Sequence, residues 1–123
     1  MKKKIRVGCA SGFWGDTDIA APQIVEKGDV DYLVFDYLSE VTMSILAGAK
    51  LKNSKDGYAK DFINHIVPLL KNIKQNKIKV ISNAGGVNLD ACKKVLISES
   101  VQKNINLKIA TVEGDDLIDY QDK

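Results

Sequence analysis

Residues 78–88, with the sequence IKVISNAGGVN, constrain the fold more than any other stretch of the chain. Ile78, Val80 and Ile81 are β-branched, which is typical of a strand covered on both faces. The N-A-G-G sequence that follows is too small and too flexible to continue a strand. Asn88 is a good helix N-cap, so we expect a buried strand, a tight glycine turn and then a helix.

Three further stretches have the apolar, β-branched character of strands: residues 4–10, 31–37 and 106–112. Strands that alternate with helices imply a parallel sheet with right-handed crossovers. We therefore expect a single α/β domain over residues 1–123, with about four parallel strands. The expected architecture is a Rossmann-like layered sheet or a partial-barrel βα repeat.

The expected helices follow from caps and from apolar spacing. The first begins at a cap among residues 16–18 and stops at Gly28, and the second covers residues 39–49 before a lysine-rich connection over residues 48–56. The third begins near residue 56 and carries one apolar face at Phe62, Ile66, Leu69 and Ile73. Pro68 predicts a kink in that helix, and the last helix covers residues 88–104.

Composition excludes several classes of protein. The 123 residues are 45% hydrophobic and 28% charged, as in a soluble globular chain, and no apolar run is long enough for a membrane span. The net charge of +2 comes from dispersed lysines, which gives nucleic-acid binding little support. We expect a cytoplasmic protein in which the two lone cysteines, Cys9 and Cys92, are buried reduced thiols.

The residues that follow the strands are candidates for a site, because ligands bind beyond the carboxyl ends of the strands in such sheets. They are Ser11, Gly12, Gly15 and Asp16 after the first expected strand, Asp36 and Tyr37 at the end of the second and Glu40 after it, Asn83, Gly85 and Gly86 after the third, and Glu113, Gly114, Asp115 and Asp116 after the fourth. The residues of each turn, taken singly, are better explained by a structural role than by a functional one, because turns favour Gly, Asn and Asp for backbone reasons. Their arrival on one edge of the sheet indicates a site.

This edge of the sheet is acidic. Six carboxylates belong to it, and no arginine accompanies them. Carboxylates gathered in one cleft repel each other, which suits a general base or a divalent-cation site. Asp16 and Asp116 are explained equally well as helix caps that point outward. No particular metal ion or cofactor follows from these residues.

Four other side chains have a structural and a functional explanation. His65 has no second ligand residue at helical spacing, so we expect it to be a partly buried packing residue. Trp14 is placed either to stack on a ligand or to cover the end of the sheet. Tyr58 and Lys60 open the third helix. Their side chains are expected either to lie on the surface or to extend into the site, and the sequence favours neither.

Three familiar α/β classes do not fit. Gly8, Gly12 and Gly15 give G-x-x-x-G-x-x-G where a dinucleotide-binding Rossmann domain has G-x-G-x-x-G. The N-A-G turn is shared with short-chain dehydrogenases, but their Tyr-x-x-x-Lys pair is missing. A response-regulator receiver needs an acidic pair at the end of its first strand, and the sequence G-C-A-S supplies none.

Five motifs in order, A-S-G-F-W-G-D, D-Y-L-S-E-V-T-M, G-Y-A-K-D-F, S-N-A-G-G-V-N and V-E-G-D-D-L, resemble the N-terminal domain of the acyclic terpene utilisation family. The resemblance covers about residues 6–117. Members of that family are longer and continue past the G-D-D turn with further α/β structure. We therefore expect this chain, which stops after the polar sequence D-Y-Q-D-K, to be the N-terminal fragment of a longer family protein.

The resemblance implies a role in bacterial catabolism of citronellol-type terpenes and related branched acids, whose intermediates are acyl-CoA thioesters. It transfers positions and no established catalytic roles. From the residues themselves, Asp36 or Glu113 is expected to act as a base or hold a metal, Asn83 to bind a substrate hydroxyl, and the Gly85-Gly86 amides to face an anionic or carbonyl oxygen. The expected catalytic positions are Asp36, Asn83, Glu113 and Asp115. The remaining residues of the edge, Gly85 and Gly86 among them, are expected to bind substrate together with Tyr58 and Lys60.

The sequence leaves two functions open. The first is an enzyme with a small-molecule substrate, such as a CoA thioester. The second is a non-catalytic binding or assembly module. In the second case, an open sheet edge would pair with another copy or with a complementary C-terminal chain.

Overall fold

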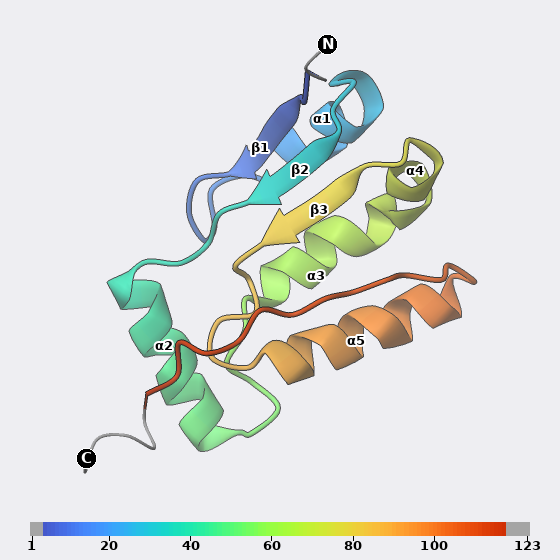
Figure 1. Ribbon diagram of the computed structural model, residues 1–123. Helices are drawn as coiled ribbons and strands as arrows, with labels where there is room; N and C mark the ends of the chain where they lie inside the picture. The colour runs from blue at the N-terminus through green and yellow to red at the C-terminus, as the bar shows by residue number, and fades with distance from the viewer. Residues whose placement is uncertain (1–3, 118–123) are drawn as a thin grey trace.

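The structure is a computed structural model that describes residues 4–117, so the polar tail expected at residues 119–123 lies outside the described part. It is an α/β fold with three parallel strands in the order β1-β2-β3, as Figure 1 shows. Their bounds are Val7–Ser11 for β1, Tyr32–Phe35 for β2 and Lys79–Ser82 for β3. The predicted class, a parallel sheet alternating with helices, is confirmed.

The helices follow the predicted order. Their bounds are Ala20–Lys27 for α1, Glu40–Lys52 for α2, Lys60–Ile66 for α3, Leu70–Gln75 for α4 and Leu89–Gln102 for α5. Pro68 lies in a 3₁₀ turn, η1 (Val67–Leu69), which separates α3 from α4. The interruption is at the predicted residue, but it divides the expected single helix in two where only a kink was predicted. The four apolar residues of the predicted face are all buried.

Several predicted helix ends need correction. The N-cap of α1 is Ile19, whose side chain makes no capping bond. Helix α1 ends at Lys27 with Gly28 as its C-cap at φ −78°, and the left-handed φ of 46° belongs to Asp29. Helix α2 extends to Lys52 through part of the predicted connection. The predicted cap at Asn88 is confirmed, since Asn88 accepts from Ala91 N, and Ser39 caps α2 by accepting from Thr42 N.

One face of the sheet carries the core. Leu33 and Phe35 of β2 point to this face, and the Phe35 ring meets the Phe62 ring of α3 edge-on with centroids 5.2 Å apart. Gly8 of β1 lies under α1, where an added Cβ would come within 2.6 Å of Ile24 Cγ2. Close contact between β1 and α1 therefore needs a residue without a side chain at Gly8.

Within residues 4–117, no helix lies across the opposite face of the sheet (Figure 1). The strand register aligns Val7 with Tyr32 and Lys79, and Cys9 with Val34 and Ile81. Val7 is 61% exposed and Ile81 54% exposed. Cys9 is exposed as well, so its predicted burial is wrong, whereas Cys92 is buried as predicted.

The fourth expected strand does not form. Residues 106–112 run beside β3 in the same general direction (Figure 1), but they make no ladder with it and have no regular secondary structure. Strand character in a sequence is local, whereas a ladder needs a partner at the right distance. The sheet of the described chain therefore ends at β3.

Candidate functional site

The ends of β2 and β3 are joined by one side chain, that of Asn83. Its Oδ1 accepts a hydrogen bond from Tyr37 N, and its Nδ2 donates to Asp36 Oδ1, both at 2.8 Å. Asn83 thus spans two neighbouring strand ends, as the parallel topology predicts. The second oxygen of the exposed Asp36 carboxylate makes no hydrogen bond within residues 4–117.

The end of β1 lies next to the same point. Ser11 Oγ donates to Asp36 O at 3.2 Å, and Asp36 N donates to Ser11 O at 3.1 Å. Beyond Ser11 the chain turns back on itself, because Asp16 Oδ2 accepts from Gly12 N at 2.8 Å and Gly15 has a left-handed φ of 86°. Asp16 therefore orders its own loop.

Tyr37 is the centre of a buried polar network that the sequence did not reveal. Its phenol lies 3.1 Å from His65 Nδ1 of α3. Burial and, to a lesser extent, the nearby Asp61 carboxylate raise the pKa of Tyr37 to about 12, against the opposing effect of a hydrogen bond from Ser11. Asp61 also accepts a hydrogen bond from Trp14 Nε1 at 2.6 Å. Trp14 thus ties the loop after β1 to α3.

His65 and Asp61 were not predicted as site residues. Asp61 and His65 are four apart on α3, a spacing that places both on the same side of the helix. That spacing is visible in the sequence, but it does not identify Tyr37 as the residue they meet. The prediction that His65 is partly buried is confirmed, and it also has a polar partner.

The glycine turn after β3 is held tightly. Gly86 N donates to Asn83 O at 3.1 Å, and a Cβ on Gly86 would lie 2.6 Å from both Gly57 O and Leu46 Cδ1. The left-handed φ of 54° at this position also favours glycine over any other residue. The Gly86 amide is therefore occupied within the turn. The Gly85 amide makes no hydrogen bond among the described residues, so of the expected pair only Gly85 offers a donor.

No hydrogen bond among the described residues links Tyr58 or Lys60 to Asp36 or Asn83. Tyr58 is buried in the core, and burial raises the pKa of its phenol. Lys60 pairs on the surface with Asp56 at 2.6 Å, which raises the pKa of the lysine and lowers that of the carboxylate. Burial also raises the pKa of the Cys92 thiol to about 11, as befits a packing residue.

The remaining acids are spread out. Glu40 occupies the exposed first turn of α2, and Glu113 accepts from Thr111 Oγ1 at 3.2 Å in the irregular segment after residue 112. Gly114, Asp115 and Asp116 are exposed in the same segment. Residues 4–117 contain no group of three or more His, Cys, Asp or Glu side chains that could hold a metal ion. The expected gathering of carboxylates into a divalent-cation site is therefore not formed by these residues.

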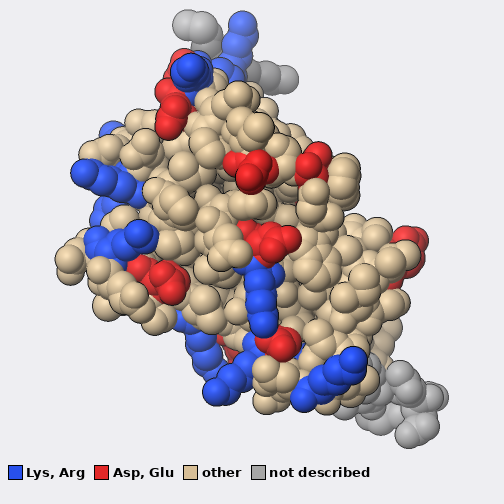
Figure 2. Space-filling view, turned by 180° about the vertical axis from the view of Figure 1, so that it is seen from behind, with Lys and Arg blue, Asp and Glu red and all other residues tan. Residues whose placement is uncertain are grey.

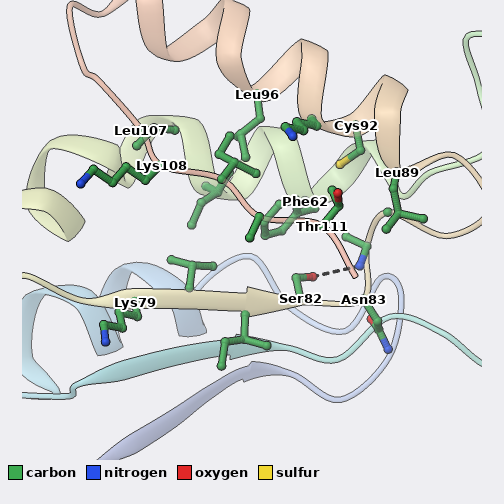
Figure 3. A pocket seen from close by; sticks show the side chains of 18 of the residues that line it. Phe62, Lys79, Ser82, Asn83, Leu89, Cys92, Leu96, Leu107, Lys108 and Thr111 are labelled. Carbon is green, nitrogen blue, oxygen red and sulfur yellow. Dashed lines mark hydrogen bonds between the residues drawn. The ribbon is translucent and has the colours of Figure 1, made fainter. Parts of the chain in front are cut away.

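A cavity of about 910 Å³ lies beside this edge of the sheet. Figure 3 shows its walls, with β3 and the glycine turn on one side and α3, α5 and the segment around Leu107 on the other. Most of the wall is apolar, including Phe62, Leu89 and Leu96. Four of the predicted site residues belong to its lining: Asn83, Gly85, Gly86 and Asp115.

Charged side chains are interspersed on the surface. Figure 2 shows Lys and Arg alternating with Asp and Glu over one face, with no continuous basic stripe on it. Among the helices of residues 4–117, none is long and apolar enough to cross a membrane. The predictions of a cytoplasmic location and of no nucleic-acid partner stay predictions.

Comparison with known proteins gives one finding. A search of curated proteins and a search of solved structures returned no match. A sequence model described as acyclic terpene utilisation family protein AtuA matches residues 5–123. This match includes the strands, the glycine turn and the segment that follows α5. The chain therefore belongs to the acyclic terpene utilisation (AtuA) family.

Proposed function

We propose that this chain is a catabolic enzyme domain of acyclic terpene or branched-chain acid utilisation that acts on an acyl-CoA or hydroxy acid. Its site is at the carboxyl ends of the strands, around Asp36 and Asn83. Family membership supports the metabolic context. The proposed substrate is a small molecule that carries an acyl or hydroxyacyl group.

The observation that carries the proposal is the position of the Asp36 carboxylate. Asn83 Nδ2 fixes one of its oxygens at 2.8 Å and leaves the other without a partner among the described residues. A general base needs this combination, because one oxygen must be oriented and the other must be accessible to the proton it removes. Asn83 is itself held by Tyr37 N, so the carboxylate is anchored to two strands.

The chemistry that fits is proton abstraction next to an acyl group. Asp36 would accept a proton from a substrate hydroxyl or from the carbon beside a thioester carbonyl. The Gly85 amide lines the adjoining cavity and would donate to the carbonyl oxygen as negative charge develops on it. Glu113 and Asp115 would join this site only if the segment after α5 changes position.

Asp36→Asn tests the base. The variant keeps an oxygen that can accept from Asn83 and loses only the basic group, so folding and binding should persist while turnover falls by about 100-fold or more. Binding and conversion of 3-hydroxy-3-methylbutyryl-CoA are measured by calorimetry and by mass spectrometry. Asp31→Asn is the matched control, because the Asp31 carboxylate also accepts one N–H hydrogen bond, from the backbone amide of Arg6, at the opposite end of β2.

Each outcome is decisive. Equal turnover in the Asp36→Asn and Asp31→Asn variants would remove Asp36 from the mechanism. A wild-type chain that neither binds nor converts any member of a panel of branched acyl-CoA thioesters and hydroxy acids would overturn the enzyme proposal.

The uncovered sheet face favours a second function, that of an assembly module. Parallel sheets are ordinarily covered on both faces, and here Val7, Cys9 and Ile81 are exposed on one of them. The partner would be a second copy of this chain or a complementary C-terminal chain. Sedimentation velocity at several concentrations tests the first, and a monomer throughout the micromolar range argues against it.

A further inference from the structure

The 910 Å³ cavity opens on the free edge of β3. Strand β3 pairs with β2 along one edge, and within residues 4–117 no segment pairs with the other. The lining takes every residue from 78 to 86 in succession, although successive side chains of a strand point to opposite faces. A cavity that touches both faces of a strand lies against its edge.

The opposite wall of this cavity is an extended segment, residues 106–112. From residue 105 onward its side chains alternate between half-buried and exposed: Ile105, Leu107, Ile109 and Thr111 are half-buried, and Asn106, Lys108, Ala110 and Val112 are exposed. A period of two is the geometry of a β-strand, and a coil has no reason to keep it over eight residues. Figure 3 shows Leu107 and Thr111 on the side of the cavity that lies opposite β3.

Both walls of the cavity have backbone groups without a backbone partner among the described residues. No backbone amide of residues 106–112 donates a hydrogen bond to another backbone group in the described chain, whereas the Ile105 amide just before them donates to Ser100 O at 2.8 Å. The free edge of β3 presents the complementary row of amides and carbonyls. Two unpaired, parallel edges that enclose an apolar cavity are less stable than a ladder that closes it.

We infer that residues 106–112 close onto β3 as an additional parallel strand, and that the chain exchanges between this closed state and the open state described above. Helix α5 provides the crossover connection that two parallel strands require. Closure buries Leu107 and Ile109 against Val80 and Leu96, which line the same cavity. It also completes the backbone pairing of β3.

Closure has a consequence for the site that rests on the proposed function. The segment runs in the general direction of β3, so its forward movement onto β3 places residues 113–115 at the carboxyl end of the sheet. Glu113 and Asp115 would then stand near Asn83 and Asp36. The open state keeps these acids apart, and the closed state would be the one competent for chemistry.

Amide hydrogen exchange tests closure without any substrate, so its failure is distinguishable from failure of the proposed function. Residue-resolved exchange is followed by NMR in dilute protein. Every second amide of residues 106–112 should exchange at least about tenfold more slowly than in an unstructured peptide, because a closed state populated at nine-tenths reduces exchange tenfold. The intervening amides, which point away from β3, should exchange freely.

Two proline variants provide a matched pair. In a strand at the edge of a sheet, neighbouring amides point to opposite sides, so only one of Ile109→Pro and Ala110→Pro removes a bond to β3. That variant should lose the protection of the segment and of the free edge of β3, and the other should retain it. Ile109→Ala, which keeps the amide, controls for the loss of the Ile109 side chain.

Three results would overturn the inference. In the first, residues 106–112 of the wild-type chain exchange at the rates of an unstructured peptide. In the second, the two proline variants behave alike. In the third, protection rises with protein concentration, which would mean that a second copy, and not this segment, pairs with β3.

Discussion

Tyr37 is 1% exposed, and its phenol lies near two elements, since Ser11 ends β1 and both His65 and Asp61 belong to α3. Its pKa is raised, so the folded state holds its proton more tightly than the unfolded chain. The folding free energy contributed by this group is therefore complete below pH 10 and is lost as the pH rises through about 12. A shift of two units corresponds to about 2.7 kcal/mol.

Tyr37→Phe should change the response to alkali more than the stability at neutral pH. At pH 7 the variant loses one hydrogen bond to a half-buried histidine, which costs about 1 kcal/mol. Between pH 10 and 12 the variant should lose less stability than the wild type. The loss that remains in the variant includes the contribution of Tyr58, whose pKa is also raised. Urea unfolding at pH 7, 10 and 11.5 measures both effects. Parallel loss of stability in the two proteins would contradict this role of the phenol.

Two glycines make a matched pair at the scale of the elements. Gly48 lies inside α2 with no atom within 4 Å of an added Cβ, so Gly48→Ala should stabilise the chain by about 0.5–1 kcal/mol. Gly86 has positive φ and faces Gly57 O and Leu46 Cδ1 at 2.6 Å, so Gly86→Ala should destabilise it by about 2 kcal/mol or more. Urea midpoints of the two variants measure both signs. Equal midpoints would mean that the contact of the glycine turn with Gly57 and α2 is loose.

The elements also show what sequence can and cannot predict. Residues 79–82 and the turn after them were predicted because β-branched residues and glycines act locally. Residues 106–112 have the same local character, yet they form no ladder, because pairing depends on how α5 places them. The link from Asn83 to Asp36 follows from topology, which brings strand ends together. The contact of His65 with Tyr37 depends on side-chain packing between α3 and β2, which no periodicity encodes.

At the scale of the whole molecule, helices pack against one face of the sheet in the described chain. Leu33 is fully buried on the inner face, while Val7 and Ile81 on the outer face remain more than half exposed. A parallel sheet with one apolar face open to water is unusual, since crossover helices ordinarily cover both faces. Exposed apolar surface of this kind favours association, because water is released when two such faces meet.

Val7→Thr with Ile81→Thr tests whether this face drives association. Threonine keeps the β-branched shape that suits a strand, and a hydroxyl replaces a methyl group of Val7 and the ethyl group of Ile81. The free energy of unfolding of the dilute monomer should therefore change by less than about 1 kcal/mol. Sedimentation velocity should show association of the wild-type chain as its concentration rises, and less association of the double variant. Leu33→Ala, on the inner face of the neighbouring strand, is the contrast and should cost about 2–5 kcal/mol. If the double variant associates as strongly as the wild type, the contact uses another surface, and the free edge of β3 becomes the next one to block.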